Sequence, residues 1–126
     1  MTKVPAGIVV FVVLHSFAVL IFIIHAIISI PFILITLFDD FDLAGFAALE
    51  IFWSWIMLSI SGAIVYGLVN RKEWSRSFVM ALAGISLIVG FIDLVSGNIF
   101  AVFAIIIDGI IISYMRKPHI IEWFNV

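Results

Sequence analysis

The sequence predicts an all-α integral membrane protein, built as an up-down bundle of four transmembrane helices. Of its 126 residues, 66% are hydrophobic and only 11% are charged, whereas a soluble domain carries about 25% charged residues. Apolar runs long enough to cross a membrane recur four times, since each crossing needs about 20 residues. All lysine and arginine residues lie between these runs or beside the chain ends.

Prolines and polar residues bound the predicted elements. Pro5 suits the first turn of a helix because its missing N–H is not needed there. Pro31 is expected to end or kink the first span, which leaves a short interfacial extension before an acidic loop. The predicted spans are residues 5–29, 46–69, 77–95 and 99–115. We expect one membrane domain, 1–126, with an outer acidic loop at 39–45, a cytoplasmic loop at 70–76 and an amphipathic cytoplasmic tail at 116–126.

The placement of the basic residues predicts the orientation. They are Lys3, Arg71, Lys72, Arg76, Arg116 and Lys117. With an even number of spans they share one side of the membrane, which the positive-inside rule assigns to the cytoplasm. We therefore expect a multi-pass protein of the cell membrane with both termini inside. The loop and tail basic residues are predicted interface anchors, together with Trp74 and Trp123 on the inner side and Trp53 and Trp55 on the outer side.

Small and polar residues recur along the spans at the spacing of a packed helix face. Lipid tails are as apolar as leucine, so helices associate in membranes through small residues and hydrogen bonds. Spacings that alternate between three and four residues are typical of left-handed helix packing. The predicted packing residues are Ser59, Ala63 and Gly67 in the second span, Ala83, Ser86, Gly90 and Gly97 along the third, and Ala101 and Ala104 in the fourth.

Five ionisable residues of the spans fall into two layers by depth. At 1.5 Å per residue, His15 lies about 15 Å from Pro5 and Asp108 about 12 Å from Arg116, so both are near the membrane centre. The other three lie about 25–31 Å from the inner ends of their spans, close to the outer surface. The predicted buried polar groups, which are also the candidate proton relay, are Asp108, His15, His25, Glu50 and Asp93.

Asp108, in the stretch AIIIDGIII, carries the strongest functional signal. An aspartate at the centre of a spanning helix costs about 2.5–3.5 kcal/mol to insert, and intramembrane acids are functional candidates by default. One interpretation is a carboxylic acid kept neutral by burial and hydrogen-bonded to a neighbour such as His15. The others are proton or ion handling, and contact with a partner subunit or lipid.

Metal, cofactor and catalytic sites have little support in the sequence. His25, Glu50 and Asp93 are suitable ligand types for a metal, but no paired spacing such as H-x3-H accompanies them. Haem is not expected, because His15 and His25 share one helix whereas axial ligands lie on opposite faces of the haem. The chain has no cysteine, which excludes disulfides and thiolate sites. No cofactor is expected, and no nucleophile motif or phosphate loop indicates an enzyme.

Two stretches, RKEWSRSFVMALAGISLIVGFIDLVSG and IIIDGIIISYMRKPHIIEWF, resemble small four-span membrane proteins of archaea and bacteria. In that class a basic-Trp-x-Arg loop opens the third span, and a tail containing tyrosine, proline and phenylalanine follows the fourth. The matching residues are Arg71, Trp74, Arg76, Tyr114, Pro118 and Phe124. The resemblance covers roughly the second half of the chain and implies the fold but no activity. An asparagine-like polar residue is common near position 108 in that class, which implies a structural role for Asp108.

Three functional hypotheses follow. The first is a small non-catalytic subunit that packs within a larger membrane complex, such as an energy-transducing one. The second is a proton- or cation-conducting protein that uses His15 with Asp108 and His25 with Glu50 and Asp93. The third is a metal-binding membrane subunit. The expected partners are the lipid bilayer and other membrane subunits or further copies of the chain, and no nucleic acid is expected.

Overall fold

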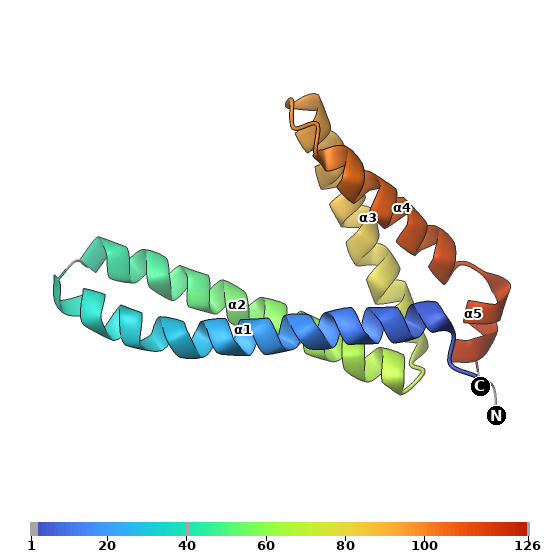
Figure 1. The fold of residues 1–126 in the computed structure, drawn as a ribbon, viewed down its shortest axis with the longest axis horizontal. Coiled ribbons are helices and arrows are strands. Elements are labelled where there is room, and N and C mark those ends of the chain that lie inside the picture. The colour runs from blue at the N-terminus through green and yellow to red at the C-terminus, as the bar shows by residue number, and fades with distance from the viewer. Residues whose placement is uncertain (1–2, 40, 126) are drawn as a thin grey trace. The chain divides into compact units, whose positions relative to one another are not determined.

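The computed structural model describes residues 3–39 and 41–125, and all regular secondary structure in this part of the chain is α-helical. The helices are α1 (Ala6–Asp39), α2 (Phe41–Val69), α3 (Glu73–Val95), α4 (Ala101–Met115) and α5 (Pro118–Phe124) (Figure 1). The first three are long and apolar enough to cross a membrane, and α4 is a shorter apolar helix. The predicted all-α class with several apolar helices is therefore confirmed, and contact with a lipid bilayer follows from it.

α1 differs from the prediction because it does not stop near Pro31. It runs as one helix to Asp39, ten residues past the predicted end of the first span. Proline removes one backbone hydrogen bond, yet in an apolar setting the other backbone groups have no better partner than the helix itself. The hydroxyls of Ser29 and Thr36 each donate to the carbonyl oxygen four residues earlier, at 2.7 and 3.0 Å. The segment after Pro31 is thus a continuation of α1 rather than a separate interfacial element.

The predicted outer loop at 39–45 is almost entirely helical. α1 ends at Asp39 and α2 begins at Phe41, which puts Asp42 in the first turn of α2. A carboxylate is favourable there because the N-terminal end of a helix carries a partial positive charge. Asp40 lies outside the described residues, as does the side chain of Asp39. The acidic residues therefore mark a tight reversal between two helices rather than a seven-residue loop.

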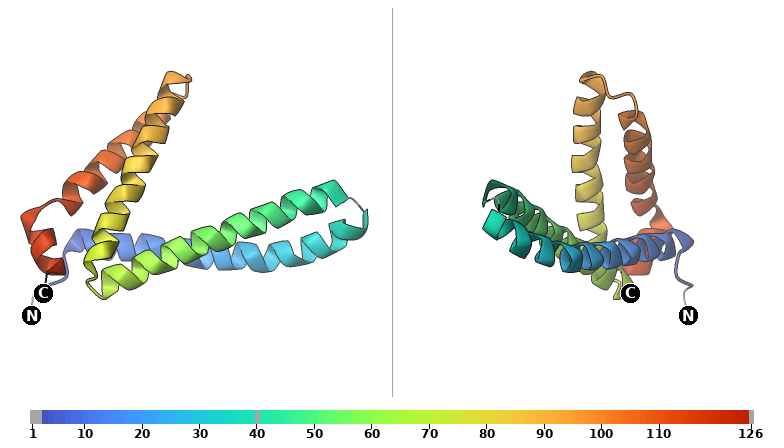
Figure 2. Two further views of the ribbon diagram at one scale, coloured as in Figure 1. Left: turned by 180° about the vertical axis from the view of Figure 1, so that it is seen from behind. Right: turned by 60° about the vertical axis from the view of Figure 1, so that its left-hand side comes forward.

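The described chain forms two compact units, and each is treated separately below. Residues 10–65 make up the hairpin unit, in which α1 and α2 run antiparallel and side by side (Figures 1 and 2). Residues 3–9 and 66–125 make up the terminal unit, which contains the end of α2, all of α3 to α5 and the start of α1.

Two similar turns join helices at the borders of α3. In each, the backbone of the residue just past the helix adopts a left-handed conformation: Arg71 with φ 53° and Gly97 with φ 100°. The residue after it donates its N–H to the carbonyl oxygen five residues earlier, Lys72 to Gly67 at 2.8 Å and Asn98 to Asp93 at 2.9 Å. This is the Schellman arrangement that satisfies the last carbonyls of a helix. The predicted loop at 70–76 is accordingly short, and α3 begins at Glu73 rather than at residue 77.

α3 and α4 pack closely against each other in the terminal unit. The buried residues of α4 are Ala101, Asp108 and Met115, which repeat every seven positions. On α3 they are Ser75, Val79, Ala83 and Gly90. A Cβ atom on Gly90 would lie 3.0 Å from Cγ1 of Ile105, so the missing side chain permits the close approach. The contact has the heptad character of left-handed helix pairs.

The predicted packing residues divide between this buried face and the surface. Ala83, Gly90, Ala101 and Gly67 are buried, and Ala63 is half-buried. Ser86, Ala104 and Ser59 are exposed, and Ser59 instead donates a hydrogen bond to the carbonyl oxygen of Trp55 at 2.8 Å. Gly97 belongs to the α3–α4 turn described above rather than to a helix face.

Candidate functional site

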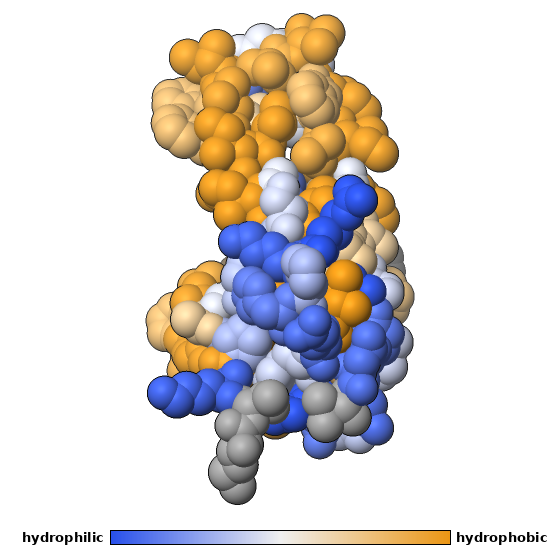
Figure 3. Space-filling model, turned by 90° about the vertical axis from the view of Figure 1, so that its right-hand side faces the viewer, coloured by the Kyte–Doolittle hydropathy of each residue, from blue (hydrophilic) through white to orange (hydrophobic). Residues whose placement is uncertain are grey.

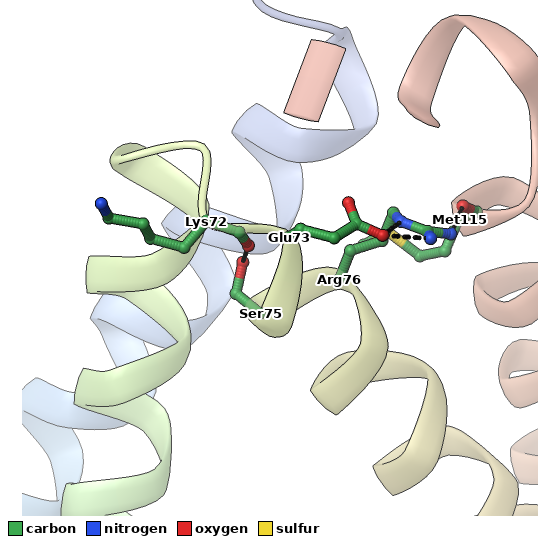
Figure 4. Close-up of polar contacts among 5 residues, drawn as sticks. All are labelled: Lys72, Glu73, Ser75, Arg76 and Met115. Atoms are coloured by element: carbon green, nitrogen blue, oxygen red, sulfur yellow. Dashed lines mark hydrogen bonds and ion pairs between the residues drawn. The ribbon is translucent and has the colours of Figure 1, made fainter. Parts of the chain in front are cut away.

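Arg76 joins the start of α3 to the end of α4 within the terminal unit. Its Nε donates to Oε1 of Glu73 at 2.9 Å, its Nη2 pairs with the same oxygen, and its Nη1 donates to the carbonyl oxygen of Met115 at 3.1 Å (Figure 4). The Arg76 side chain is only 14% exposed. The last carbonyls of a helix lack partners within it, so a guanidinium there both satisfies one of them and interacts favourably with the helix dipole. Arg76, predicted as an interface anchor, thus also fixes two helix ends together.

Tyr114 ties the start of α1 to the end of α4. Its Oη accepts a hydrogen bond from the backbone N–H of Gly7 at 3.0 Å. A Cβ atom on Gly7 would overlap the Tyr114 ring, so glycine is what allows the approach. The same ring meets His119 edge-on at 6.2 Å between centroids, and Nζ of Lys117 lies 5.6 Å from its centre. No sequence pattern predicts this contact, because the two residues are 107 positions apart.

A cavity of about 550 Å³ lies beside this contact, lined by residues 3–7 together with Tyr114, His119, Glu122 and Trp123. Trp123 is 5% exposed, and the guanidinium of Arg71 lies 5.0 Å from the centre of its ring. Within the described residues, its indole Nε1 is buried without a hydrogen-bond partner. Trp123 was expected to be an anchor at the membrane surface, but its side chain is part of the packed end of the terminal unit.

All six basic residues of the chain belong to the terminal unit. They lie in the N-terminal segment, in the α2–α3 turn and first turn of α3, and between α4 and α5. Hydrophilic side chains gather at this end of the unit, while the α3–α4 pair above it presents an apolar surface (Figure 3). The predicted anchors Lys72, Trp74, Arg116 and Lys117 are exposed there. This arrangement is typical of a helix bundle whose basic end meets the membrane surface.

Asp108 lies on the buried face between α4 and α3. Its side chain is 7% exposed, and its Oδ2 has no hydrogen-bond partner among the described residues. Gly90 of α3 approaches Ile105 of α4, and Arg76 of α3 bonds to Met115, so Asp108 lies on the stretch of α4 between these two contacts with α3. A buried polar atom without a partner is rare in native structures, and strain, a functional role or a bound water can account for it.

His15 belongs to the hairpin unit, whereas Asp108 belongs to the terminal unit. The Nδ1–H of His15 donates to the carbonyl oxygen of Phe11, one turn earlier on α1, at 2.9 Å. This bond assigns the proton of the neutral ring to Nδ1 and leaves Nε2 as the nitrogen able to accept one.

His25 and Glu50, predicted as buried polar groups of one layer, line one cavity in the hairpin unit, where both side chains are exposed. The cavity measures about 410 Å³ and is completed by Phe46, Leu49, Trp53 and Ser54. Nδ1 of His25 lies 3.0 Å from Oγ of the buried Ser54, which links α1 to α2. Trp55, the other predicted outer anchor, is exposed on α2.

The third residue of that predicted layer, Asp93, is exposed near the end of α3 in the terminal unit. Throughout residues 3–39 and 41–125, no group of three or more histidine, aspartate or glutamate side chains could hold a metal ion. The three-ligand metal site considered from the sequence therefore has no structural support in this part of the chain.

The fold and these sites define a class: an all-α chain with three candidate membrane spans, a shorter apolar helix and one strongly basic end. Comparison with protein families, with curated proteins and with solved structures finds no match. Functional inference therefore rests on the chain's own geometry.

Proposed function

We propose that the protein is a small non-catalytic membrane subunit that packs within a larger assembly of membrane proteins. The observation that carries the proposal is the length of α1. Its apolar part, Ala6–Phe38, has 33 residues, or about 50 Å at 1.5 Å per residue. The hydrocarbon core is only about 30 Å thick.

Tilting alone does not remove this mismatch. Spanning helices tilt by at most about 40°, at which a 50 Å helix still covers about 38 Å of membrane depth. Either the tip of the hairpin stays outside the core with Phe38 fully exposed, or the whole hairpin is drawn inward and carries His25 and Glu50 into hydrocarbon. In the first position the apolar side chain of Phe38 is exposed to water, and in the second the polar side chains of His25 and Glu50 are exposed to lipid. Contact with a neighbouring protein would bury either set of side chains.

We propose further that α4 forms a fourth span, with both termini in the cytoplasm. The grouping of the six basic residues in the terminal unit supports this orientation through the positive-inside rule. An even number of crossings is needed to keep the N-terminal lysine and the basic residues around α5 on one side.

Photo-crosslinking in native membranes tests the subunit role. A benzophenone amino acid replaces Phe38, which is 89% exposed at the hairpin tip, or Val95, which is 88% exposed at the end of α3 and serves as the control. We expect Phe38 to give an adduct with another polypeptide and Val95 to give lipid adducts only. The subunit role is overturned if Phe38 also gives only lipid adducts and the native protein, extracted in detergent, migrates at its monomer mass of 14.1 kDa.

A second candidate function, proton conduction, is favoured by the buried Oδ2 of Asp108, which has no hydrogen-bond partner among the residues that the structure describes. Intramembrane carboxyl groups serve as proton relays in pumps and transporters. If the protein conducts protons through Asp108, proteoliposomes should show a proton flux that Asp108→Asn abolishes and Asp93→Asn, at an exposed site, does not. Background flux in both the wild type and Asp108→Asn rules conduction out.

A further inference from the structure

The cavity of the hairpin unit is lined by an exposed carboxyl group, that of Glu50, in a unit that contains no lysine or arginine. Its walls are His25, Phe46, Leu49, Glu50, Trp53 and Ser54. Residues 4–70 contain no lysine or arginine at all, so no ammonium or guanidinium group of α1 or α2 can pair with Glu50. The other ionisable group of the cavity wall, His25, already has its Nδ1 bonded to Ser54. A lysine or arginine that pairs with Glu50 must therefore come from outside the hairpin.

The depth of the cavity shows what kind of cation can reach it. Between the cavity and the acidic turn, residues 26–38 and 43–49 carry no charge, so we place these segments inside the membrane, the second of the two positions given above. Glu50 is nine residues from the start of α2 at Phe41, or about 14 Å along the helix axis. Acidic groups at such depth normally pair with opposite charges in the membrane interior.

We propose that this cavity binds a lysine or arginine side chain carried by a membrane-spanning helix of a partner polypeptide. The proposal rests on the subunit role proposed above and names the chemistry of the partner. Glu50 supplies the counter-charge. Phe46 and Trp53, both exposed on α2, supply ring faces that attract ammonium and guanidinium groups.

Other cations fit the cavity less well. A second copy of the chain in parallel orientation has its basic residues near the other end of α2, since Val69 lies about 29 Å from Glu50 along the helix. The ammonium group of a lipid lies in the headgroup layer, level with the acidic turn rather than with Glu50. Inorganic cations favour several oxygen ligands, and this cavity offers one carboxylate.

Synthetic membrane helices provide the test. A leucine–alanine peptide of about 24 residues, long enough to span a bilayer, carries one lysine about nine residues from its outer end, level with Glu50. A matched peptide carries glutamine at that position. Their association with the full-length protein is measured by energy transfer in phosphatidylglycerol vesicles, with a dye on a cysteine introduced at Ser29. The chain has no other cysteine to interfere.

We expect the lysine peptide to associate about tenfold more tightly than the glutamine peptide, as a charge-assisted hydrogen bond would give. Glu50→Gln should remove this preference, and Glu50→Lys should transfer it to a peptide that carries glutamate. Glu122→Gln, at an exposed carboxylate of α5, serves as the control and should leave the preference intact.

The proposal is overturned if both peptides bind wild-type protein equally. It is also overturned if phosphatidylethanolamine in the vesicles abolishes the lysine preference, because a lipid ammonium group would then be the occupant. Neither outcome depends on crosslinking at Phe38. Failure of this inference is therefore distinguishable from failure of the subunit role.

Discussion

Replacing Asp108 with leucine is expected to raise the equilibrium constant for membrane insertion of isolated α4 more than a hundredfold. On insertion scales, aspartate at a helix centre is unfavourable by about 2.5–3.5 kcal/mol, and leucine is favourable by about 0.3–0.6 kcal/mol. The difference of about 3–4 kcal/mol is more than two factors of ten in an equilibrium constant. Asp108 is the eighth of the 15 residues of α4, so it bears the full central penalty.

The effect is large because α4 is marginal as a span. Its 15 residues measure about 22 Å, less than the hydrocarbon thickness of about 30 Å. α3 has 23 residues and no such deficit. The buried face that joins the two helices includes Asp108 itself, so pairing with α3 shields the carboxyl group from lipid. We therefore expect wild-type α4 to depend on α3 for stable insertion.

An insertion reporter that carries either residues 99–117 or residues 73–117 measures both effects. The short wild-type segment should insert poorly, Asp108→Leu should make it insert almost fully, and the longer segment should insert without any substitution. Ile107→Leu is the control, because it exchanges one apolar residue for another beside Asp108. Efficient insertion of the short wild-type segment would mean that α4 crosses the membrane independently and does not need the α3 face.

The sequence predicts the helices well because lipid leaves the backbone no alternative partner. In hydrocarbon every N–H and C=O must be satisfied within the chain, so a long apolar run is helical wherever it lies. The same reason explains the two departures. Pro31 and the acidic turn were interpreted by rules for helices in water, whereas α1 continues through Pro31 to Asp39 and α2 starts at Phe41.

The packing face was predictable only in part, because residue size is a weaker guide than helical phase. Selecting small residues correctly identified Ala83, Gly90 and Ala101, which are buried. The same criterion selected Ala104. In the structure the next residue, Ile105, contacts Gly90 beside the buried face that contains Ala101 and Asp108. Gly97 met the size criterion as well, but its positive φ serves the turn.

The candidate sites show where sequence reasoning stops. His25 and Glu50 share a cavity because depth alone is informative for two helices joined by a tight turn. Depth says nothing about rotation, so it could not decide which other ionisable groups meet. The bond between Gly7 and Tyr114 joins residues near opposite ends of the chain, and no local periodicity encodes such a pair.

Of the glycines in α2, Gly67 is the least able to accept a side chain, because the α2–α3 turn brings the start of α3 close to it. Gly67 is buried, and a Cβ atom there would overlap Cβ of Ser75 and lie 2.9 Å from Cζ2 of Trp74. Ser75 is fully buried, and its Oγ donates to the carbonyl oxygen of Lys72 at 2.7 Å. A Cβ atom moves only with its backbone, so the start of α3 would have to shift as a whole.

Gly67→Ala is therefore expected to lower the free energy of unfolding by about 1–3 kcal/mol, the range for overpacked interiors. Gly62→Ala provides a matched control on the same helix, because nothing lies within 4 Å of a Cβ atom at that position. Alanine is favoured over glycine in a helix interior by about 0.5–1 kcal/mol, so the control should stabilise the protein slightly. Denaturant unfolding in detergent micelles measures both variants. Opposite signs are the expected result, and a Gly67→Ala variant as stable as Gly62→Ala would show that α3 does not approach α2 at this turn.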